Sequence, residues 1–171
     1  MPNLGDDWAW CPRCGGPLER RARGGTMRPS CPACGFVFFA NPGVGAATVI
    51  RDDLGRILLV QRGRKQFGAG KWCLPCGYVE WGEDVRDAAR REALEEAGVE
   101  VTLGEVVQVT SNFHEPEKPS IGVWFAATLV DPAATPIAGD DAVGVGWFDR
   151  ATLPPLAFPT DAALLAALLA P

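Results

Sequence analysis

Three glutamates within one short segment have the spacing and the chemistry of a metal site. On an α-helix, Glu92, Glu95 and Glu96 lie at positions i, i+3 and i+4, so their carboxylates share one face. Like charges at this spacing cost roughly 0.2–0.5 kcal/mol per pair, and a hard divalent cation with oxygen ligands reverses that cost. Such an ion on a pyrophosphate activates water and neutralises developing charge. The alternative is a solvated helix with ion pairs, for which Asp87, Arg91 and Glu95 have suitable spacing.

The residues around these glutamates predict one helix with defined ends. Residues 85–97 are rich in helix formers. Glu83 and Asp84 come just before them, and carboxylates near a helix N-terminus bind its free amides and oppose the dipole. Gly98 is well placed to adopt the left-handed conformation that ends many helices. The sequence therefore predicts that the three glutamates project from a single rigid element.

The segment from Gly77 to Val99 contains a longer pattern of glycines, acids and one arginine. Its fixed positions are Gly77, Glu83, Arg91-Glu92, Glu95-Glu96 and Gly98-Val99. This pattern resembles the Nudix box, G-x5-E-x7-R-E-U-x-E-E-x-G-U with U apolar, and every fixed position is filled. Ala93 is small where a larger aliphatic residue is usual. The resemblance implies a metal-dependent hydrolase of a nucleoside diphosphate linked to another group.

The resemblance also implies roles for individual residues. Glu92 and Glu96 would bind Mg²⁺ or Mn²⁺ directly, and Glu95 would bind or bridge such ions. The carbonyl of Gly77 would add a ligand, and Arg91 would orient a glutamate. The implied catalytic residues are Glu83, Arg91, Glu92, Glu95 and Glu96, of which Glu83 supports the others without binding the ion.

All six cysteines fall in Cys-x-x-Cys pairs. The first two pairs, Cys11/Cys14 and Cys31/Cys34, are each followed by glycine and lie sixteen residues apart. This layout predicts a zinc ribbon, in which two tight knuckles present four thiolates to a tetrahedral Zn²⁺. Two disulfides are the alternative, but no signal peptide is apparent, so we expect a cytoplasmic protein and zinc. The zinc would be structural, because four thiolates leave no open position.

The third pair, Cys73 and Cys76, precedes the box directly. The segment Trp72-Cys73-Leu74-Pro75-Cys76-Gly77 is similar to a Trp-x-Leu-Pro-Gly-Gly segment that often precedes a Nudix box. We interpret both cysteines as small, partly buried residues of a strand and loop. A redox pair or a second metal site is the alternative.

Size and composition indicate one ordinary domain with a small appendage. The chain has 171 residues, of which 47% are hydrophobic and 22% charged, and its longest apolar run is too short to span a bilayer. The net charge is −5, yet the segment from Cys11 to Cys34 carries about +4, from Arg13, Arg20, Arg21, Arg23, Arg28 and Glu19. A basic ribbon could contact RNA. A solvated hairpin is the favoured alternative, because no aromatic residues interleave these arginines.

The order of elements predicts the fold class. Strands are expected at 45–51, 56–62, 101–111, 121–131 and 143–148, and a C-terminal helix carries leucines at 164, 165, 168 and 169 on one face. This is an α+β pattern. It fits the Nudix fold, a mixed β-sheet sandwiched between α-helices, with a small N-terminal zinc ribbon. We expect the ribbon over residues 8–40 and the Nudix hydrolase domain over residues 41–171.

A ribbon followed by this domain resembles the zinc-ribbon Nudix hydrolases, which include NADH pyrophosphatases and hydrolases of ADP-ribose or FAD. The NADH-cleaving enzymes carry a Ser-Gln-Pro-Trp-Pro-Phe-Pro array after the box, which residues 111–116 lack. Many relatives also place a glutamate in a Gly-Asp-Asp-Ala-x-Glu segment, where this chain has Gly144. The candidates for a catalytic base are therefore Glu92, Glu115, Glu117 and Asp141.

Together these features predict a Mg²⁺- or Mn²⁺-dependent pyrophosphohydrolase that releases a nucleoside monophosphate, with ADP-ribose as first substrate, then FAD and NADH. The resemblance implies a homodimer. The predicted substrate contacts are Arg62, Arg64 or Lys65 for phosphate, Tyr78, Phe113 or Trp124 for adenine, and Glu115 or His114 from a loop. Core packing is the alternative for each aromatic residue. The rival function is a nucleotide-sensing or RNA-binding module that uses the basic ribbon.

Overall fold

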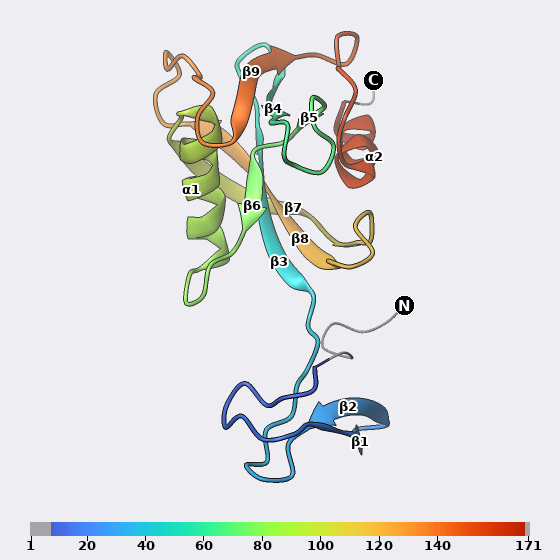
Figure 1. Cartoon of the computed structure of the whole chain (residues 1–171). Coiled ribbons are helices and arrows are strands. Elements are labelled where there is room, and N and C mark those ends of the chain that lie inside the picture. Colours follow the sequence, from blue (N-terminus) through green and yellow to red (C-terminus); the bar gives the residue numbers. More distant parts are fainter. Residues whose placement is uncertain (1–7, 170–171) are drawn as a thin grey trace. The chain divides into compact units, whose positions relative to one another are not determined.

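The computed structural model describes residues 8–169 (Figure 1). The chain divides into two compact units, one that ends at Pro42 and one that begins at Gly43. No helix within the described range is long and apolar enough to cross a membrane. Each unit is built around its own elements.

The first unit contains a short antiparallel hairpin. Strand β1 (Glu19–Arg23) pairs with β2 (Thr26–Ser30). Two glycines with positive φ, Gly24 at 58° and Gly25 at 78°, make the turn between the strands. Side chains are strained in this region of backbone conformation and glycine is not, so the Gly-Gly pair permits the tight reversal.

The second unit is built on two sheets. One sheet has the order β6-β3-β8-β7 and the other β5-β4-β9. β3 runs parallel to β8 and the remaining pairs are antiparallel, so the larger sheet is mixed. The strands are β3 (Gly43–Ile50), β4 (Ile57–Arg62), β5 (Trp72–Cys73), β6 (Cys76–Tyr78), β7 (Val101–Asn112), β8 (Ser120–Leu129) and β9 (Ala142–Phe148).

The long strands follow the hydrophobic pattern of the sequence. In β4, the four residues from Ile57 to Val60 are all buried, as expected of a strand covered on both faces. The five predicted strands are all present, with ends within two residues of those expected. β5 and β6 were not predicted, because two or three residues are too few to display a periodicity.

Helix α1 (Val85–Ala97) has the ends predicted for it. The side chain of Asp84 caps the N-terminus by accepting from the amide of Arg86 at 2.8 Å. Gly98 ends the helix in the left-handed conformation, with φ at 66°, and its amide donates to the carbonyl of Leu94. The buried face carries small side chains that allow a close approach to the sheet: Ala88, Ala89, Ala93 and Ala97.

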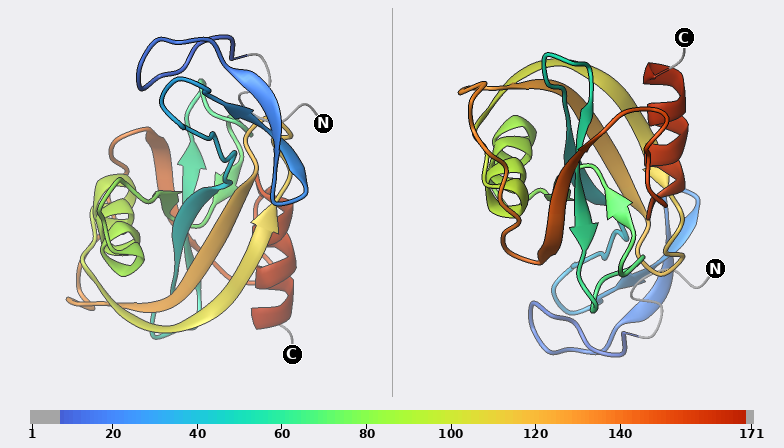
Figure 2. Two further views of the ribbon diagram at one scale, coloured as in Figure 1. Left: turned by 90° about the horizontal axis from the view of Figure 1, so that it is seen from below. Right: turned by 90° about the horizontal axis from the view of Figure 1, so that it is seen from above.

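Helix α2 (Pro159–Leu168) covers the opposite side of the unit (Figure 2). Pro159 occupies its first turn, where a missing amide costs no hydrogen bond. Leu164 and Leu165 are buried, and Leu168 and Leu169 pack against the same cluster, as the sequence predicted. The unit is therefore an α+β fold in which a mixed sheet lies between helices, which confirms the predicted fold class.

Candidate active site

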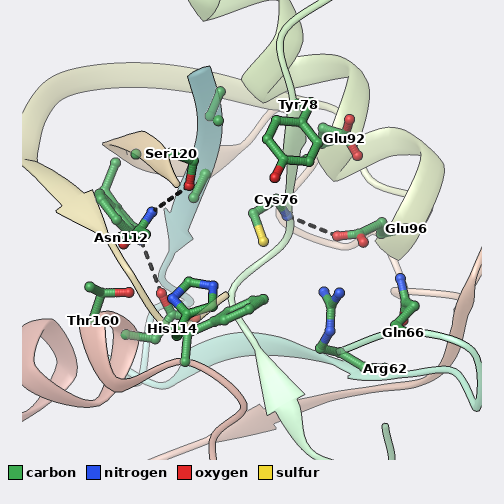
Figure 3. A pocket seen from close by; sticks show the side chains of 18 of the residues that line it. Arg62, Gln66, Cys76, Tyr78, Glu92, Glu96, Asn112, His114, Ser120 and Thr160 are labelled. Atoms are coloured by element: carbon green, nitrogen blue, oxygen red, sulfur yellow. Dashed lines mark hydrogen bonds between the residues drawn. The ribbon is translucent and has the colours of Figure 1, made fainter. Parts of the chain in front are cut away.

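One pocket of about 410 Å³ gathers side chains from α1 and α2, from strands β3, β4, β6, β7 and β8, and from several loops (Figure 3). Glu92 and Glu96 reach it from α1, and Arg62 and Gln66 reach it from β4 and the loop that follows. The remaining polar lining includes Cys76, Tyr78, Glu80, Asn112, His114, Glu115, Ser120, Asp140, Asp141, Thr160 and Asp161. The pocket therefore has an acidic side beside α1 and a single half-buried arginine facing it.

Gly77 lets a carboxylate lie directly against the backbone of β6. A Cβ atom at this position would lie 2.1 Å from Oε1 of Glu92, which no side chain could tolerate. Gly77 pairs with Ala46 of the neighbouring strand β3, so the backbone here is fixed by the sheet. A glycine is required at this point because the Glu92 carboxylate occupies the space of a side chain.

Glu96 is held from the other side of the same segment. Its Oε2 accepts from the backbone amide of Cys76 at 2.8 Å, and the side chain is buried. Burial raises the pKa of Glu96 to about 8 and also raises the pKa of Glu92. Removing a carboxylate from water disfavours its charged form. A bound divalent cation would favour the charged form again. Two buried carboxylates beside a backbone segment thus fit a hard metal ion with oxygen ligands.

Arg91 ties the helix to the loop that precedes it. Its guanidinium donates to both oxygens of Glu83 at 2.8 and 3.0 Å, to Glu92 at 2.7 Å and to Glu95 at 3.0 Å. It also donates to the carbonyl of Tyr78 at 3.1 Å. These bonds lower the pKa of Glu83 to about 2 and raise the pKa of Arg91. The arginine thereby orients Glu92 and fixes the loop from Tyr78 to Glu83.

The glutamates of the box do not form one closed group. Within residues 8–169, only the four cysteines of the first unit bring three or more ligand atoms within 4.8 Å of one another. Glu92 and Glu96 line the pocket, whereas the side chain of Glu95 is 45% exposed and pairs with Arg91. Of the two ion pairs that the solvated-helix alternative offered, Arg91 with Glu95 is present at 3.0 Å, whereas Asp87 pairs with Arg90 at 2.7 Å.

Arg62 is the predicted phosphate contact that the structure brings into the pocket. Its guanidinium lies 4.8 Å from the centre of the Phe158 ring and donates to the carbonyl of Phe67 at 2.7 Å. Another nitrogen lies 3.7 Å from the sulfur of Cys73. These contacts hold the positive charge opposite Glu96 (Figure 3).

The other predicted contacts differ in whether they line the pocket. Tyr78, which is 50% exposed, lines the pocket together with His114, Glu115 and Asp141. The pocket lining does not include Arg64, Lys65, Phe113 or Glu117. Trp124 touches the pocket but is only 4% exposed, so the core alternative is correct for its ring.

Sequence reasoning missed several residues that lie far apart in the chain. The amide of Asn112, at the end of β7, donates to Ser120 of β8 at 3.2 Å. Asp161 is buried at the start of α2 and accepts from the amide of Leu74 and the indole of Trp124, both at 3.1 Å. Burial raises the pKa of Asp161 to about 6. An aspartate within an otherwise apolar terminal helix was the signal that could have revealed it.

Gly144 stands where many relatives have a glutamate, so this position provides no catalytic carboxylate. It lies on β9 opposite Gln61, and a Cβ there would approach Oε1 of Gln61 to 3.1 Å. The acidic residues of the preceding loop that do line the pocket are Asp140 and Asp141, and Gln66 donates a hydrogen bond to Asp141. Side chains from the 63–67 loop and the 139–142 loop therefore meet at the pocket edge.

Cys73 and Cys76 are buried and half-buried thiols of β5 and β6. Contact with Cys73 and burial raise the pKa of Cys76 well above its ordinary value. Their environment is that of small packing residues, which is how we interpreted the sequence.

The four remaining cysteines form a cluster in the first unit. The Cys11 and Cys34 sulfurs lie 3.7 Å apart and those of Cys14 and Cys31 3.6 Å apart, and none is in a disulfide. A tetrahedron with Zn–S bonds of about 2.3 Å has edges of about 3.8 Å, so the cluster fits Zn²⁺. The backbone amide of Cys34 lowers the pKa of Cys31, whereas hydrogen bonds to the Cys34 and Cys31 thiols raise the pKa of Cys14, so without zinc the four sulfurs share protons.

Known proteins are similar to this chain in both sequence and fold. Residues 41–168 match the family model described as the NUDIX domain. The chain is 34% identical over 124 residues to the ADP-ribose pyrophosphatase of Methanocaldococcus jannaschii, covering 72% of this chain and 71% of that protein. It is 30% identical over 154 residues to the NAD-capped RNA hydrolase NudC of Chromobacterium violaceum, covering 90% of this chain. It spans between 32% and 55% of the length of the NAD-capped RNA hydrolases that it matches.

A solved structure extends the likeness over nearly the whole chain. A NUDIX hydrolase from Nitrosomonas europaea is similar with a TM-score of 0.79 and 29% identity, covering 91% of this chain and 87% of that one. An ADP-ribose pyrophosphatase from Streptococcus suis is similar with a TM-score of 0.61 and 27% identity, covering 75% and 90%. The matched family model, the relatives and the fold agree with the box geometry, and the chain therefore belongs to the Nudix hydrolase family.

Proposed function

We propose that this protein hydrolyses the pyrophosphate bond of a nucleoside diphosphate derivative, with ADP-ribose as first substrate, then FAD and NADH. The observation that carries the proposal is the pair of buried carboxylates, Glu92 and Glu96, which face Arg62 across one pocket. Carboxylates suit a divalent ion and an arginine suits a phosphate. The arrangement supports binding of a pyrophosphate between opposite charges.

Glu92 and Glu96 would hold Mg²⁺ or Mn²⁺, together with the backbone at Gly77. The bound ion supplies Lewis-acid stabilisation and lowers the pKa of a coordinated water. Arg91 holds the Glu92 carboxylate in place through its 2.7 Å bond, and the amide of Cys76 does so for Glu96 at 2.8 Å. We assign Glu95 a weaker contribution, because it is half-exposed and lies beside Arg91 rather than in the pocket lining.

Arg62 would bind a phosphate oxygen, since its stack on Phe158 and its bond to Phe67 leave it fixed before a ligand arrives. A group that is already ordered loses little entropy on binding. Tyr78 is the aromatic residue at the pocket best exposed for stacking on adenine. We do not assign Arg64 and Phe113 a direct contact with substrate, because neither lines the pocket.

The catalytic base would come from the loops at the pocket edge. Glu115 and Asp141 line the pocket, whereas the lining does not include Glu117. Glu115→Gln and Glu117→Gln form a matched pair of variants two residues apart in one loop. If Glu115 accepts the proton of the attacking water, its variant loses about 10²–10⁴-fold in kcat while the Glu117 variant keeps wild-type turnover. Equal turnover of the two variants would remove Glu115 from the proposal.

ADP-ribose comes first because relatives named as ADP-ribose pyrophosphatases match in sequence and in structure. The segment at 111–116 lacks the array of the NADH-cleaving group. The test is product release from ADP-ribose, NADH, FAD, dinucleoside polyphosphates and oxidised deoxynucleoside triphosphates; AMP is the product expected from the first three. We expect AMP and ribose 5-phosphate from ADP-ribose, lost on chelation and restored by Mg²⁺ alone. If the folded, zinc-loaded protein cleaves none of these compounds, the hydrolase proposal is wrong and the nucleotide-sensing alternative is favoured.

We further propose that Cys11, Cys14, Cys31 and Cys34 bind one structural Zn²⁺, and that residues 8–40 and 41–171 act as a ribbon and a hydrolase domain. The sulfur separations of 3.6 and 3.7 Å support the zinc assignment. Metal analysis of purified protein should give one zinc per chain, and the Cys31→Ser variant should give none. Full zinc content in that variant would contradict the assignment.

A further inference from the structure

The hairpin of the first unit sorts its arginines onto two faces. The strand register places Arg21 directly opposite Arg28. Residues opposite each other in antiparallel strands point to the same side, and so do residues two apart within one strand. Arg23 therefore shares a face with Arg21 and Arg28, whereas Arg20 lies on the other face.

An exposed aromatic ring adjoins the same arginines. The guanidinium of Arg28 lies 4.8 Å from the centre of the Phe39 ring, and Phe39 is 55% exposed. The segment before it runs beside β2, where the amide of Phe38 donates to the carbonyl of Pro29 at 2.9 Å. Phe39 follows Cys34 and so lies outside the segment from Cys11 to Cys34, in which no aromatic residue interleaves the arginines. We call Arg21, Arg23, Arg28 and Phe39 the arginine face.

The arginine face contributes one bond to the hairpin, from the guanidinium of Arg28 to the carbonyl of Arg23, but its charges oppose one another. Like charges directly opposite each other across two strands are destabilising. The carboxylate of Glu19 reaches Arg21 at 2.8 Å, but both side chains are about half exposed, and solvent weakens such a pair. All five residues of β1 are exposed, so these side chains support no core. An exposed cluster of positive charge whose members repel one another is suited to an anionic ligand.

We propose that the arginine face binds single-stranded RNA, with the arginines on successive phosphates and Phe39 stacked on a base. Arg21 and Arg23 are about 6.8 Å apart along the strand, so each can contact a separate phosphate. A flat ring beside basic side chains is the combination that holds unpaired bases without sequence preference. An acidic peptide would satisfy the charge but has no base to stack on the ring. This proposal goes beyond pyrophosphate hydrolysis and does not depend on it.

The test is fluorescence anisotropy of a labelled oligouridylate of about 12 nucleotides with the full, zinc-loaded chain. Three phosphate contacts predict a slope of about −2 for log K against log salt between about 50 and 200 mM. The Arg21→Gln/Arg28→Gln double variant should reduce the slope by about 1.4. Phe39→Leu should weaken binding roughly tenfold and leave the slope unchanged. Arg20→Gln is the matched control on the opposite face, and we expect wild-type affinity.

Three results would overturn the proposal: an affinity that does not change with salt, an equal loss in Arg20→Gln, or displacement by poly-glutamate as effective as by unlabelled RNA. Zinc content and circular dichroism of each variant show whether the ribbon is intact. ADP-ribose turnover is measured on the same samples. Variants that lose RNA binding and keep turnover support the arginine face. A wild-type protein that binds RNA without hydrolysing any nucleotide would refute only the proposed hydrolase function.

Discussion

The two groups of candidate metal ligands differ in how the chain holds them. In the first unit, four sulfurs lie within 4.8 Å of one another, each pair on a short knuckle. In the second unit, Glu92 and Glu96 lie against the backbone of β6 and Glu95 is drawn aside by Arg91. Four thiolates around one point repel one another unless a cation lies between them, whereas Glu92 and Glu95 already share the positive charge of Arg91. We therefore expect the sulfur cluster and its hairpin to depend on zinc, whereas the second unit keeps its fold without a catalytic ion.

This difference matches the difference in expected roles. Four sulfurs around one point form a closed site, which suits a structural metal. Separated carboxylates at the edge of a pocket leave room for water and phosphate oxygens, which suits a catalytic metal. Arg91 binds Glu83, Glu92 and Glu95 and so neutralises part of their charge in the absence of an ion.

The largest effect should follow the removal of zinc. Structural Zn²⁺ contributes roughly 10–16 kcal/mol to small domains, and the first unit has little core of its own. Stripping the metal should expose the amides of β1 and β2 to fast hydrogen exchange while those of β4 and β8 stay protected. Cys73→Ser, outside the cluster, is the control and should keep its zinc. Continued protection of β1 and β2 without zinc would contradict the contrast between the units.

The next effect concerns the two kinds of glutamate in the box. Because a bound ion supplies several kcal/mol of transition-state stabilisation, Glu96→Gln should lower kcat on ADP-ribose by about 10²–10³-fold. Glu95→Gln removes the same charge from the exposed side of the helix and should cost less than about tenfold. Steady-state kinetics at saturating Mg²⁺ distinguishes them. Equal losses would show that all three carboxylates form one site in solution.

A smaller effect is expected at Asp161. Its two oxygens accept from Leu74 and Trp124, and asparagine would offer only one acceptor. Asp161→Asn should therefore lower the free energy of unfolding by about 1–3 kcal/mol, the cost of one buried unpaired donor. Urea denaturation measures the change, with the surface variant Asp131→Asn as control. An unchanged urea midpoint would mean that the two hydrogen bonds of Asp161 do not stabilise the fold.

The mildest effect is a dependence of metal binding on pH. Burial raises the pKa of Glu96 to about 8 in the metal-free protein, so below that pH an ion must displace a proton. Apparent Mg²⁺ affinity should fall by up to about tenfold per pH unit as pH decreases below 8. Because the pKa of Glu96 is higher in the folded than in the unfolded chain, the metal-free fold loses stability as pH rises from about 4.5 to 8. Calorimetric Mg²⁺ titrations at several pH values test this, and a profile that is the same in Glu96→Gln would contradict it.

Local features of the sequence were enough for the elements that hold metal ligands. The helix from Val85 to Ala97 begins at Asp84 and ends at Gly98 because capping and spacing are properties of adjacent residues. The cysteine knuckles are local in the same way. The mixed sheet between helices followed from the order of long strands, and only the short β5 and β6 were missed.

The far side of the pocket could not be predicted from local pattern. Asn112, Ser120 and Asp161 meet there because strand pairing and the packing of α2 bring together segments that are distant in sequence. Periodicity contains no information on such contacts. For the same reason Phe113 and Tyr78 were equal candidates for stacking, and only the fold places Tyr78 at the pocket.

The most direct test of the central contrast is a Mn²⁺ titration of the zinc-loaded protein at neutral pH, with free Mn²⁺ followed by electron paramagnetic resonance. The wild-type protein should bind Mn²⁺ in the second unit while zinc stays bound to the four cysteines. The Glu92→Gln/Glu96→Gln double variant should keep its zinc and bind Mn²⁺ at least about 100-fold more weakly. If that variant binds Mn²⁺ as tightly as the wild type, the box glutamates are not the site of the catalytic ion.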